Sequence, residues 1–136
     1  MTTAQLPAAQ ESYVAKDNDS TKRSRDWLLT PRTSLMAWWI PQAAILAGLI
    51  VPVPARTAIW IIALIWMGTA CILNAQRCGR THCRFTGPFY LAMIFPVLAL
   101  GLVSYSLSGW LVLGASIVVA DKFIWWATER AWGKFS

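Results

Sequence analysis

The sequence predicts an all-α integral membrane protein in which four transmembrane helices form an antiparallel bundle. Composition is the first reason: 57% of the 136 residues are hydrophobic and 13% are charged, which is too apolar for a water-soluble domain of this size. The second is a series of four apolar runs, each close to the length that a helix needs to cross a bilayer. The third is the nine tryptophans, because indole rings prefer the headgroup region.

Residues 1–35 are predicted to be a disordered cytoplasmic tail with an interfacial segment. The tail has no apolar core, which excludes a signal peptide, and it mixes acids and bases as disordered segments do. Trp27, Leu28 and Leu29 precede the first apolar run and are expected to rest in the headgroup layer as a short anchor.

The transmembrane domain is predicted over residues 36–128. Its helices are expected at residues 36–53, 57–75, 87–107 and 109–128, since each run approaches the roughly 20 residues that cross a hydrocarbon core of about 30 Å. Short connections make sequential helices antiparallel neighbours. Pro41 and Pro96 fall inside the first and third helices, where each is expected to bend the chain. Residues 129–136 are predicted to be a short cytoplasmic tail.

Basic residues set the predicted orientation. Of the twelve lysines and arginines, only Arg56 falls at the opposite end of the predicted bundle from the others. The positive-inside rule therefore predicts that both termini and the connection around residues 76–86 are cytoplasmic. Trp60 and Trp110 are expected near the outer interface. Trp66 falls in mid-membrane, where its ring should pack against a neighbouring helix because its N–H has no partner in hydrocarbon.

The stretch QRCGRTHCRFTGP, residues 76–88, is the main candidate for chemistry. It holds Cys78, His82 and Cys83, which are two of the three cysteines and the only histidine. Thiolate and imidazole are ligands that zinc, copper(I) and other soft metals prefer. These three residues therefore predict a soft-metal site for zinc, copper(I) or a mercury-like ion.

The turn between the second and third helices has its own local signals. Gly79 is expected to cap the second helix, and Cys71, Asn74 and Cys78 share one face if that helix continues to the glycine. The Thr-Gly-Pro sequence that ends at Pro88 reads as the start of the next helix, with proline in the first turn.

Cys71 and Asp121 are predicted to be further ligands or to contact the residues that bind the metal. Asp121 is the only acid inside an apolar run, about 10 Å from the inner interface at about 1.5 Å per residue. An unpaired carboxylate at that depth is costly, so it needs a base, a metal or a proton. The expected partners are Arg77, Arg80 or His82, because Lys122 points about 100° away around the helix.

The basic residues of the turn have a second interpretation. Arg77, Arg80 and Arg84 are expected to contact lipid phosphates or other anions, as positive-inside residues do. Positive charge beside Cys78 also favours a thiolate, which leaves open a redox pair formed by Cys78 and Cys83.

The string NAQRCGRTHCRFTGP, from Asn74 to Pro88, resembles a motif of small, functionally uncharacterised bacterial multi-span membrane proteins. Those proteins carry an R-C-G-R-x-H-C signature before a T-G-P helix start. The resemblance covers about a tenth of the chain. It implies a protein of the bacterial cytoplasmic (inner) membrane and assigns no activity.

Three function classes remain open from the sequence. The leading prediction is a small inner-membrane protein that binds a soft metal ion through its cytoplasmic Cys/His turn, for metal handling, sensing or transport. The alternative is a non-catalytic structural or accessory subunit, in a homo-oligomer or a larger membrane complex. The third is a membrane thiol oxidoreductase. Nucleic acid is not expected as a partner, because the lysines and arginines flank apolar runs. Hydrolytic activity is not expected either, because the sequence shows no nucleophile with its acid-base partners.

Overall fold

The computed structural model describes residues 8–26, 29–103 and 106–133. Within these residues the chain is helical with short connections, in agreement with the all-α class that the sequence predicts. The helices are α1 (Ala8–Ser24), α2 (Pro31–Ser34), the π-helical turn η1 (Leu35–Trp39), α3 (Ile40–Gly48), α4 (Val53–Cys78), α5 (Thr81–Ala92), α6 (Ile94–Val103) and α7 (Leu107–Trp132).

Three helical segments in the described residues are long and apolar enough to cross a membrane: α4, the joined α5 and α6, and α7. This agrees with a multi-pass membrane protein. The expected first span, residues 36–53, covers most of η1, all of α3 and the connection to α4, which begins at Val53.

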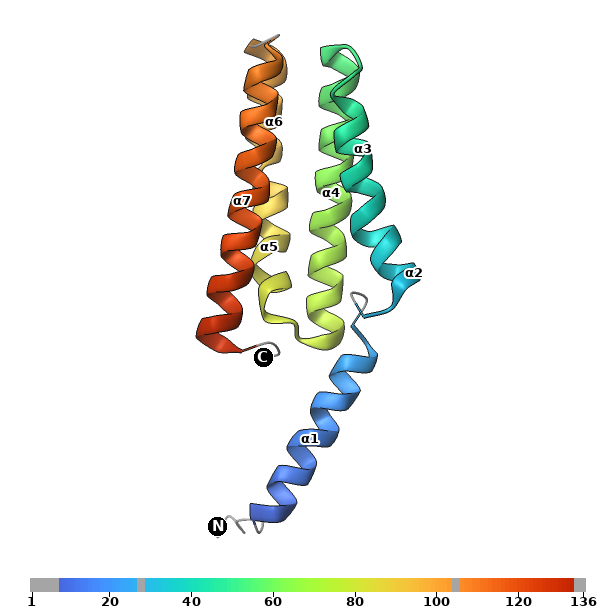
Figure 1. The fold of residues 1–136 in the computed structure, drawn as a ribbon, viewed down its shortest axis with the longest axis vertical. Coiled ribbons are helices and arrows are strands. Elements are labelled where there is room, and N and C mark those ends of the chain that lie inside the picture. The colour runs from blue at the N-terminus through green and yellow to red at the C-terminus, as the bar shows by residue number, and fades with distance from the viewer. Residues whose placement is uncertain (1–7, 27–28, 104–105, 134–136) are drawn as a thin grey trace.

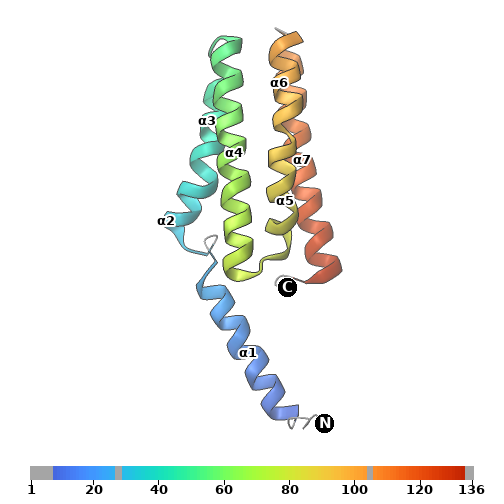
Figure 2. The ribbon, with the colours of Figure 1, turned by 180° about the vertical axis from the view of Figure 1, so that it is seen from behind.

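The helices are arranged as an open row (Figure 1). α4 lies between α3 on one side and α5 with α6 on the other, and α7 packs on α5 and α6. The reverse view in Figure 2 gives the same order. In the described part of the chain α3 and α7 do not pack on each other, so the row stays open between its two outer members.

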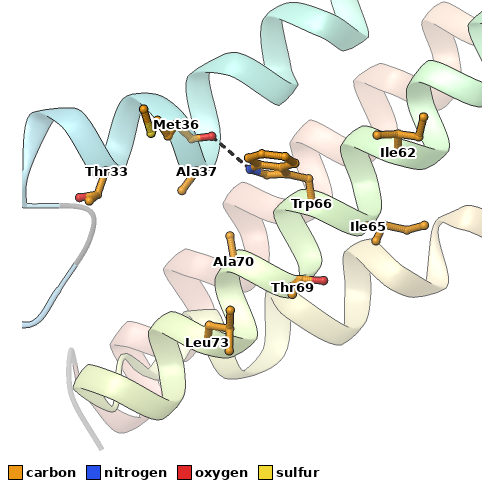
Figure 3. A pocket seen from close by; sticks show the side chains of 9 residues that line it. All are labelled: Thr33, Met36, Ala37, Ile62, Ile65, Trp66, Thr69, Ala70 and Leu73. Carbon is orange, nitrogen blue, oxygen red and sulfur yellow. Dashed lines mark hydrogen bonds between the residues drawn. The ribbon is translucent and has the colours of Figure 1, made fainter.

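The π-helical turn η1 has an identifiable cause in Pro41. The Ile40 N–H donates to the Leu35 carbonyl, five residues back, and Pro41 has no N–H to give. The Met36 carbonyl therefore has no donor from its own helix. The Trp66 indole N–H from α4 supplies one, at 3.2 Å (Figure 3). Although its ring is 54% exposed, Trp66 thus has the N–H partner that its mid-membrane position requires.

Two further α4 side chains bind the end of α3. The Trp60 indole N–H donates to the Ile45 carbonyl at 3.1 Å. Arg56 is buried, and its guanidinium donates to the Gly48 carbonyl at 3.2 Å, the Leu49 carbonyl at 2.8 Å and the Val51 carbonyl at 3.1 Å. These carbonyls lie at and just beyond the C-terminus of α3, where a helix leaves carbonyls without α-helical partners, and a cation there also suits the helix dipole.

Trp60 and Trp110, which the sequence predicts near the outer interface, lie inside the protein. Both rings are fully buried and meet edge to face, with centroids 5.1 Å apart and an interplanar angle of 82°. They belong to the main apolar core together with Leu64, Met67 and Val97. Burial of such large rings between α4 and α7 contributes more to packing than headgroup contact would.

The turn after α4 is shorter than expected. Gly79 caps α4 with a φ of 66° and a ψ of 30°, as predicted for a glycine C-cap. The next helix begins at Thr81, however, so Pro88 lies inside α5 rather than in its first turn. Gly87 therefore has a different role from the predicted helix start. A Cβ at this position would lie 2.6 Å from Cγ1 of Ile72, so the glycine permits the close crossing of α4 and α5. The break that Pro96 predicts is present at Met93, between α5 and α6.

The N-terminal tail also differs from the prediction of disorder. Residues Ala8–Ser24 form α1, which extends away from the other helices in Figures 1 and 2. Its described side chains are mostly exposed, and hydroxyl groups bond within it, such as Thr21 to the Asp17 carbonyl at 3.0 Å. Local bonds and good helix formers account for this helix without a buried face.

Candidate functional site

A buried ionic cluster lies where α4 meets α5. Arg80 binds the Asp26 carboxylate, and its Nη2 lies 3.5 Å from Oε1 of Glu129 on α7. Asn74 on α4 donates to Oδ1 of Asp26 at 3.0 Å, while Nδ1 of His82 lies 3.0 Å from Oε1 of Glu129. The side chains of Asp26 and Arg80 are 0% and 8% exposed. Such charges are stable only because each is paired and hydrogen-bonded.

The neighbours of His82 fix its tautomer. A carboxylate accepts hydrogen bonds, so the 3.0 Å contact with Glu129 requires the proton on Nδ1. The longer 3.4 Å approach of Arg80 Nε to the same nitrogen is then not a hydrogen bond. Nε2 keeps its lone pair, and it lies 3.4 Å from Sγ of Cys83. Glu129 thereby orients His82 as a carboxylate orients a ligating or proton-accepting imidazole.

Two thiols from adjacent helices meet beside this imidazole. The side chains of Cys71 on α4 and Cys83 on α5 interact with each other, and both residues are almost completely buried. Thr86 lies with its hydroxyl 3.6 Å from Sγ of Cys71, and the Asn74 amide lies 3.7 Å from Sγ of Cys83. We call Cys71 and Cys83 the thiol pair.

Cys78 does not belong to the thiol pair. Its thiol donates to the Asn74 carbonyl one turn back along α4, at 3.0 Å, and is buried there. Of the three residues predicted to bind a metal, the structure brings His82 and Cys83 together and directs Cys78 to a backbone carbonyl. In the described residues no three His, Cys, Asp or Glu side chains are grouped closely enough to hold a metal ion together.

Asp121 has different partners from those expected. Its Oδ2 lies 3.4 Å from Nζ of Lys122, and its carboxylate also interacts with Tyr90 on α5. The prediction that Arg80 or His82 would pair with it is wrong, because both bind Glu129 instead. Although the two Cα positions diverge around the helix, the long Lys122 side chain turns back to its neighbour.

The three arginines of the turn divide into two groups. Arg77 and Arg84 are exposed, as the predicted contact with lipid phosphates requires. Arg80 is buried in the ionic cluster, so the same prediction is wrong for it. The arginine that follows the glycine cap faces the protein interior and takes its counterions from distant segments.

Sequence reasoning missed two acids of the ionic cluster. The sequence places Asp26 in the predicted N-terminal tail and Glu129 in the predicted C-terminal tail, because neither residue belongs to an apolar pattern. Asn74 was noted only for sharing a face with the cysteines. The missing signal is long range, since 54 residues separate Arg80 from Asp26 and 47 separate His82 from Glu129.

A polar cavity of about 300 Å³ lies against the thiol pair. Its walls come from η1, α3, α4, α5 and α7. The residues that line it are Leu29, Trp38, Gln42, Cys71, Arg80, His82, Thr86, Tyr90, Asp121, Lys122 and Trp125. The cavity gives Cys71 and His82 a route to a ligand, whereas Cys83 lies behind them.

Comparison of this chain with protein-family models, with curated proteins and with solved structures found no match.

Proposed function

We propose that this chain is a four-span protein of the bacterial inner membrane that binds a soft metal ion through the thiol pair. The role would be metal handling, sensing or transport. The observation that carries the proposal is that Cys83 lies 3.4 Å from the oriented imidazole of His82 and interacts with Cys71, which is buried on the adjacent helix. This changes the predicted ligand set, because Cys71 replaces Cys78.

The proposed topology has both termini in the cytoplasm. Support comes from the contacts of Arg80, which bring the segment between α1 and α2 and the end of α7 to the turn between α4 and α5. These three regions carry most of the basic residues, in keeping with the positive-inside rule. The run from α2 to α3 would also cross the membrane, which brings the number of crossings to four.

The number of thiols favours a particular kind of ion. Zinc prefers four ligands, and the described side chains group too few of them. Two thiolates suit copper(I) or mercury(II), which accept a linear pair of sulfur ligands. Copper(I) is the physiological candidate of the two.

The site also provides for the protons. Thiols bind metals as thiolates, so each cysteine must lose a proton when the ion enters. Nε2 of His82, with its lone pair 3.4 Å from Sγ of Cys83, can accept one of them. The other proton, from Cys71, can pass to water through the polar cavity that Cys71 lines.

The test is the copper content of detergent-purified protein after growth with added copper, by mass spectrometry under reducing conditions. We expect about one copper per chain in the wild type and in the matched control Cys78→Ala, and none in the double variant Cys71→Ala/Cys83→Ala. Thermal unfolding in detergent checks that every variant is folded.

Two results would contradict the proposal. If copper is lost in Cys78→Ala but kept in the double variant, the thiol pair does not bind it, and the predicted site that includes Cys78 would be the better assignment. A folded wild type that contains no copper would remove the metal function altogether.

An apolar groove favours a second candidate, an accessory subunit that packs against another membrane protein. The groove has a volume of about 560 Å³ and lies between η1 and α4 (Figure 3). It is lined by Thr33, Met36, Ala37, Ile62, Ile65, Trp66, Thr69, Ala70 and Leu73. A transmembrane helix of a partner would fill it. Ala70→Phe should then release that partner, whereas the thiol double variant should keep it.

A further inference from the structure

The polar cavity lies next to an apolar one, and four residues line both. The second cavity, of about 240 Å³, shares Gln42, Tyr90, Asp121 and Lys122 with the first. Its other walls are apolar side chains and one glycine, namely Ile45, Leu46, Trp60, Leu64, Met67, Gly114, Ile117 and Val118. Together the two cavities have a polar part and an apolar part with Asp121 at their junction. That division suits a molecule with a charged head and an apolar chain.

The two cavities open between α3 and α7, the outer helices that do not pack on each other in the described part of the chain. Gln42 and Leu46 on α3 and Val118 and Lys122 on α7 are exposed cavity residues, so they form the rim. A ligand could therefore enter from the side as well as along the polar cavity. Nothing in the described packing has to separate for entry.

Lys122 shows what kind of head group the junction accepts. Its ammonium nitrogen lies 3.4 Å from Asp121 Oδ2 and 5.9 Å from the centre of the Trp125 ring. A carboxylate and an aromatic face are the two groups that hold an organic ammonium ion. The Lys122 side chain is 66% exposed, so it is a tethered cation that a ligand could displace at small cost.

The other charges of the cavity are already neutralised. Arg80 pairs with Asp26 and Glu129, and the Nδ1–H of His82 donates a hydrogen bond to Glu129. Asp121 is therefore the carboxylate that can exchange its partner. Once Lys122 leaves, a cation must replace it, since the carboxylate is only 18% exposed.

We propose that the joined cavities bind an amphiphile with an ammonium head, which pairs with Asp121 and contacts Trp125, and an apolar chain, which occupies the cavity beneath Trp60. Lys122 is the built-in competitor of this ligand. The inference does not depend on metal binding, because it uses Asp121 and Lys122 rather than the thiol pair. The same chemistry could come from a dissolved alkylammonium ion or from the ammonium of a phosphatidylethanolamine lipid.

The experiment is calorimetric titration of the lipid-stripped protein, in an uncharged maltoside detergent, with hexyltrimethylammonium. We expect binding to weaken about tenfold in Asp121→Asn, which removes the charge of the junction. We expect it to strengthen by about threefold to tenfold in Lys122→Gln, which removes the competitor. Matched substitutions on the exposed face of α1, Asp17→Asn and Lys16→Gln, should leave binding unchanged.

The opposite signs at two adjacent residues separate this site from a folding effect, since a damaged fold would weaken binding in both variants. Equal binding by the wild type and both variants would overturn the proposal, as would weaker binding in Lys122→Gln. Phosphatidylethanolamine that co-purifies with the wild type and is lost in Asp121→Asn, without binding of the dissolved amphiphile, would identify the lipid as the source of the ammonium. Cys83→Ala, at a thiol that lines neither cavity, should bind the amphiphile as the wild type does even if it binds no metal.

Discussion

Arg80 joins segments that lie far apart in the chain. Asp26 comes from the connection between α1 and α2 and Glu129 from the last turns of α7, and both carboxylates reach the same guanidinium. Arginine suits this position because its planar fork can bind two carboxylates at once and stays charged when it is buried. A lysine would offer one ammonium and a shorter reach.

We predict that Arg80→Gln destabilises the protein by about 3–5 kcal/mol, because Asp26 would then be a buried charge without its cation. The control is Arg84→Gln, which changes an exposed arginine of the same turn and should alter stability by less than about 0.5 kcal/mol. Unfolding by titration with a denaturing detergent measures both. Equal stability of the two variants would mean that the ionic cluster contributes little to the fold.

Residue types could be predicted from the sequence more easily than residue pairs. Cys83 and His82 were recognisable as chemistry-bearing because they are rare and adjacent. The pairing of Cys71 with Cys83 was not, since it depends on how closely α4 and α5 cross at Gly87. A buried carboxylate such as Asp121 signals that a partner is needed, but the sequence does not say which one.

At the scale of elements, one proline changes how two helices are joined. Pro41 accompanies the π-helical turn η1, and the Met36 carbonyl that this turn leaves open accepts from Trp66. A tryptophan in mid-membrane thereby connects α4 to the helix before it. The contact is polar, directional and surrounded by the apolar groove of Figure 3.

We expect Trp66→Phe to lower the stability of the protein by about 1–2 kcal/mol, because the ring is retained while the Met36 carbonyl loses its donor. Trp39→Phe, at a ring that is 64% exposed, should have little effect. Thermal unfolding in detergent compares the two. If both variants unfold at the same temperature, lipid or water satisfies the Met36 carbonyl as well as Trp66 does.

Helix positions could be predicted from apolar runs, whereas helix ends required tertiary information. α4 ends at the glycine that the sequence indicates, because a left-handed residue is a local requirement. The predicted start of α5 is wrong because Thr81, His82 and Thr86 are polar and become buried only by contacts with α4 and α7. Local patterns cannot distinguish such a segment from a loop.

At the scale of the whole molecule, the topology has a direct test. Cys78 and Cys83 are buried, so a membrane-impermeant thiol reagent should not report on the native turn. In a cysteine-free background we expect Ser20→Cys and Gln76→Cys to react only from the cytoplasmic side, and Ser108→Cys only from the opposite side. All three positions are exposed. Reaction of Ser20→Cys and Gln76→Cys from opposite sides would contradict the proposed four crossings.

The contacts between α4 and the preceding helices have a consequence for how the protein enters the membrane. Trp66, Trp60 and Arg56 supply donors to carbonyls that the earlier segment cannot satisfy by itself. Each open carbonyl would cost several kcal/mol in hydrocarbon. The segment from α2 to α3 is therefore a poor candidate for release into lipid as a single helix during synthesis. We expect it to wait at the insertion machinery until α4 has emerged, so that the two leave as a hairpin.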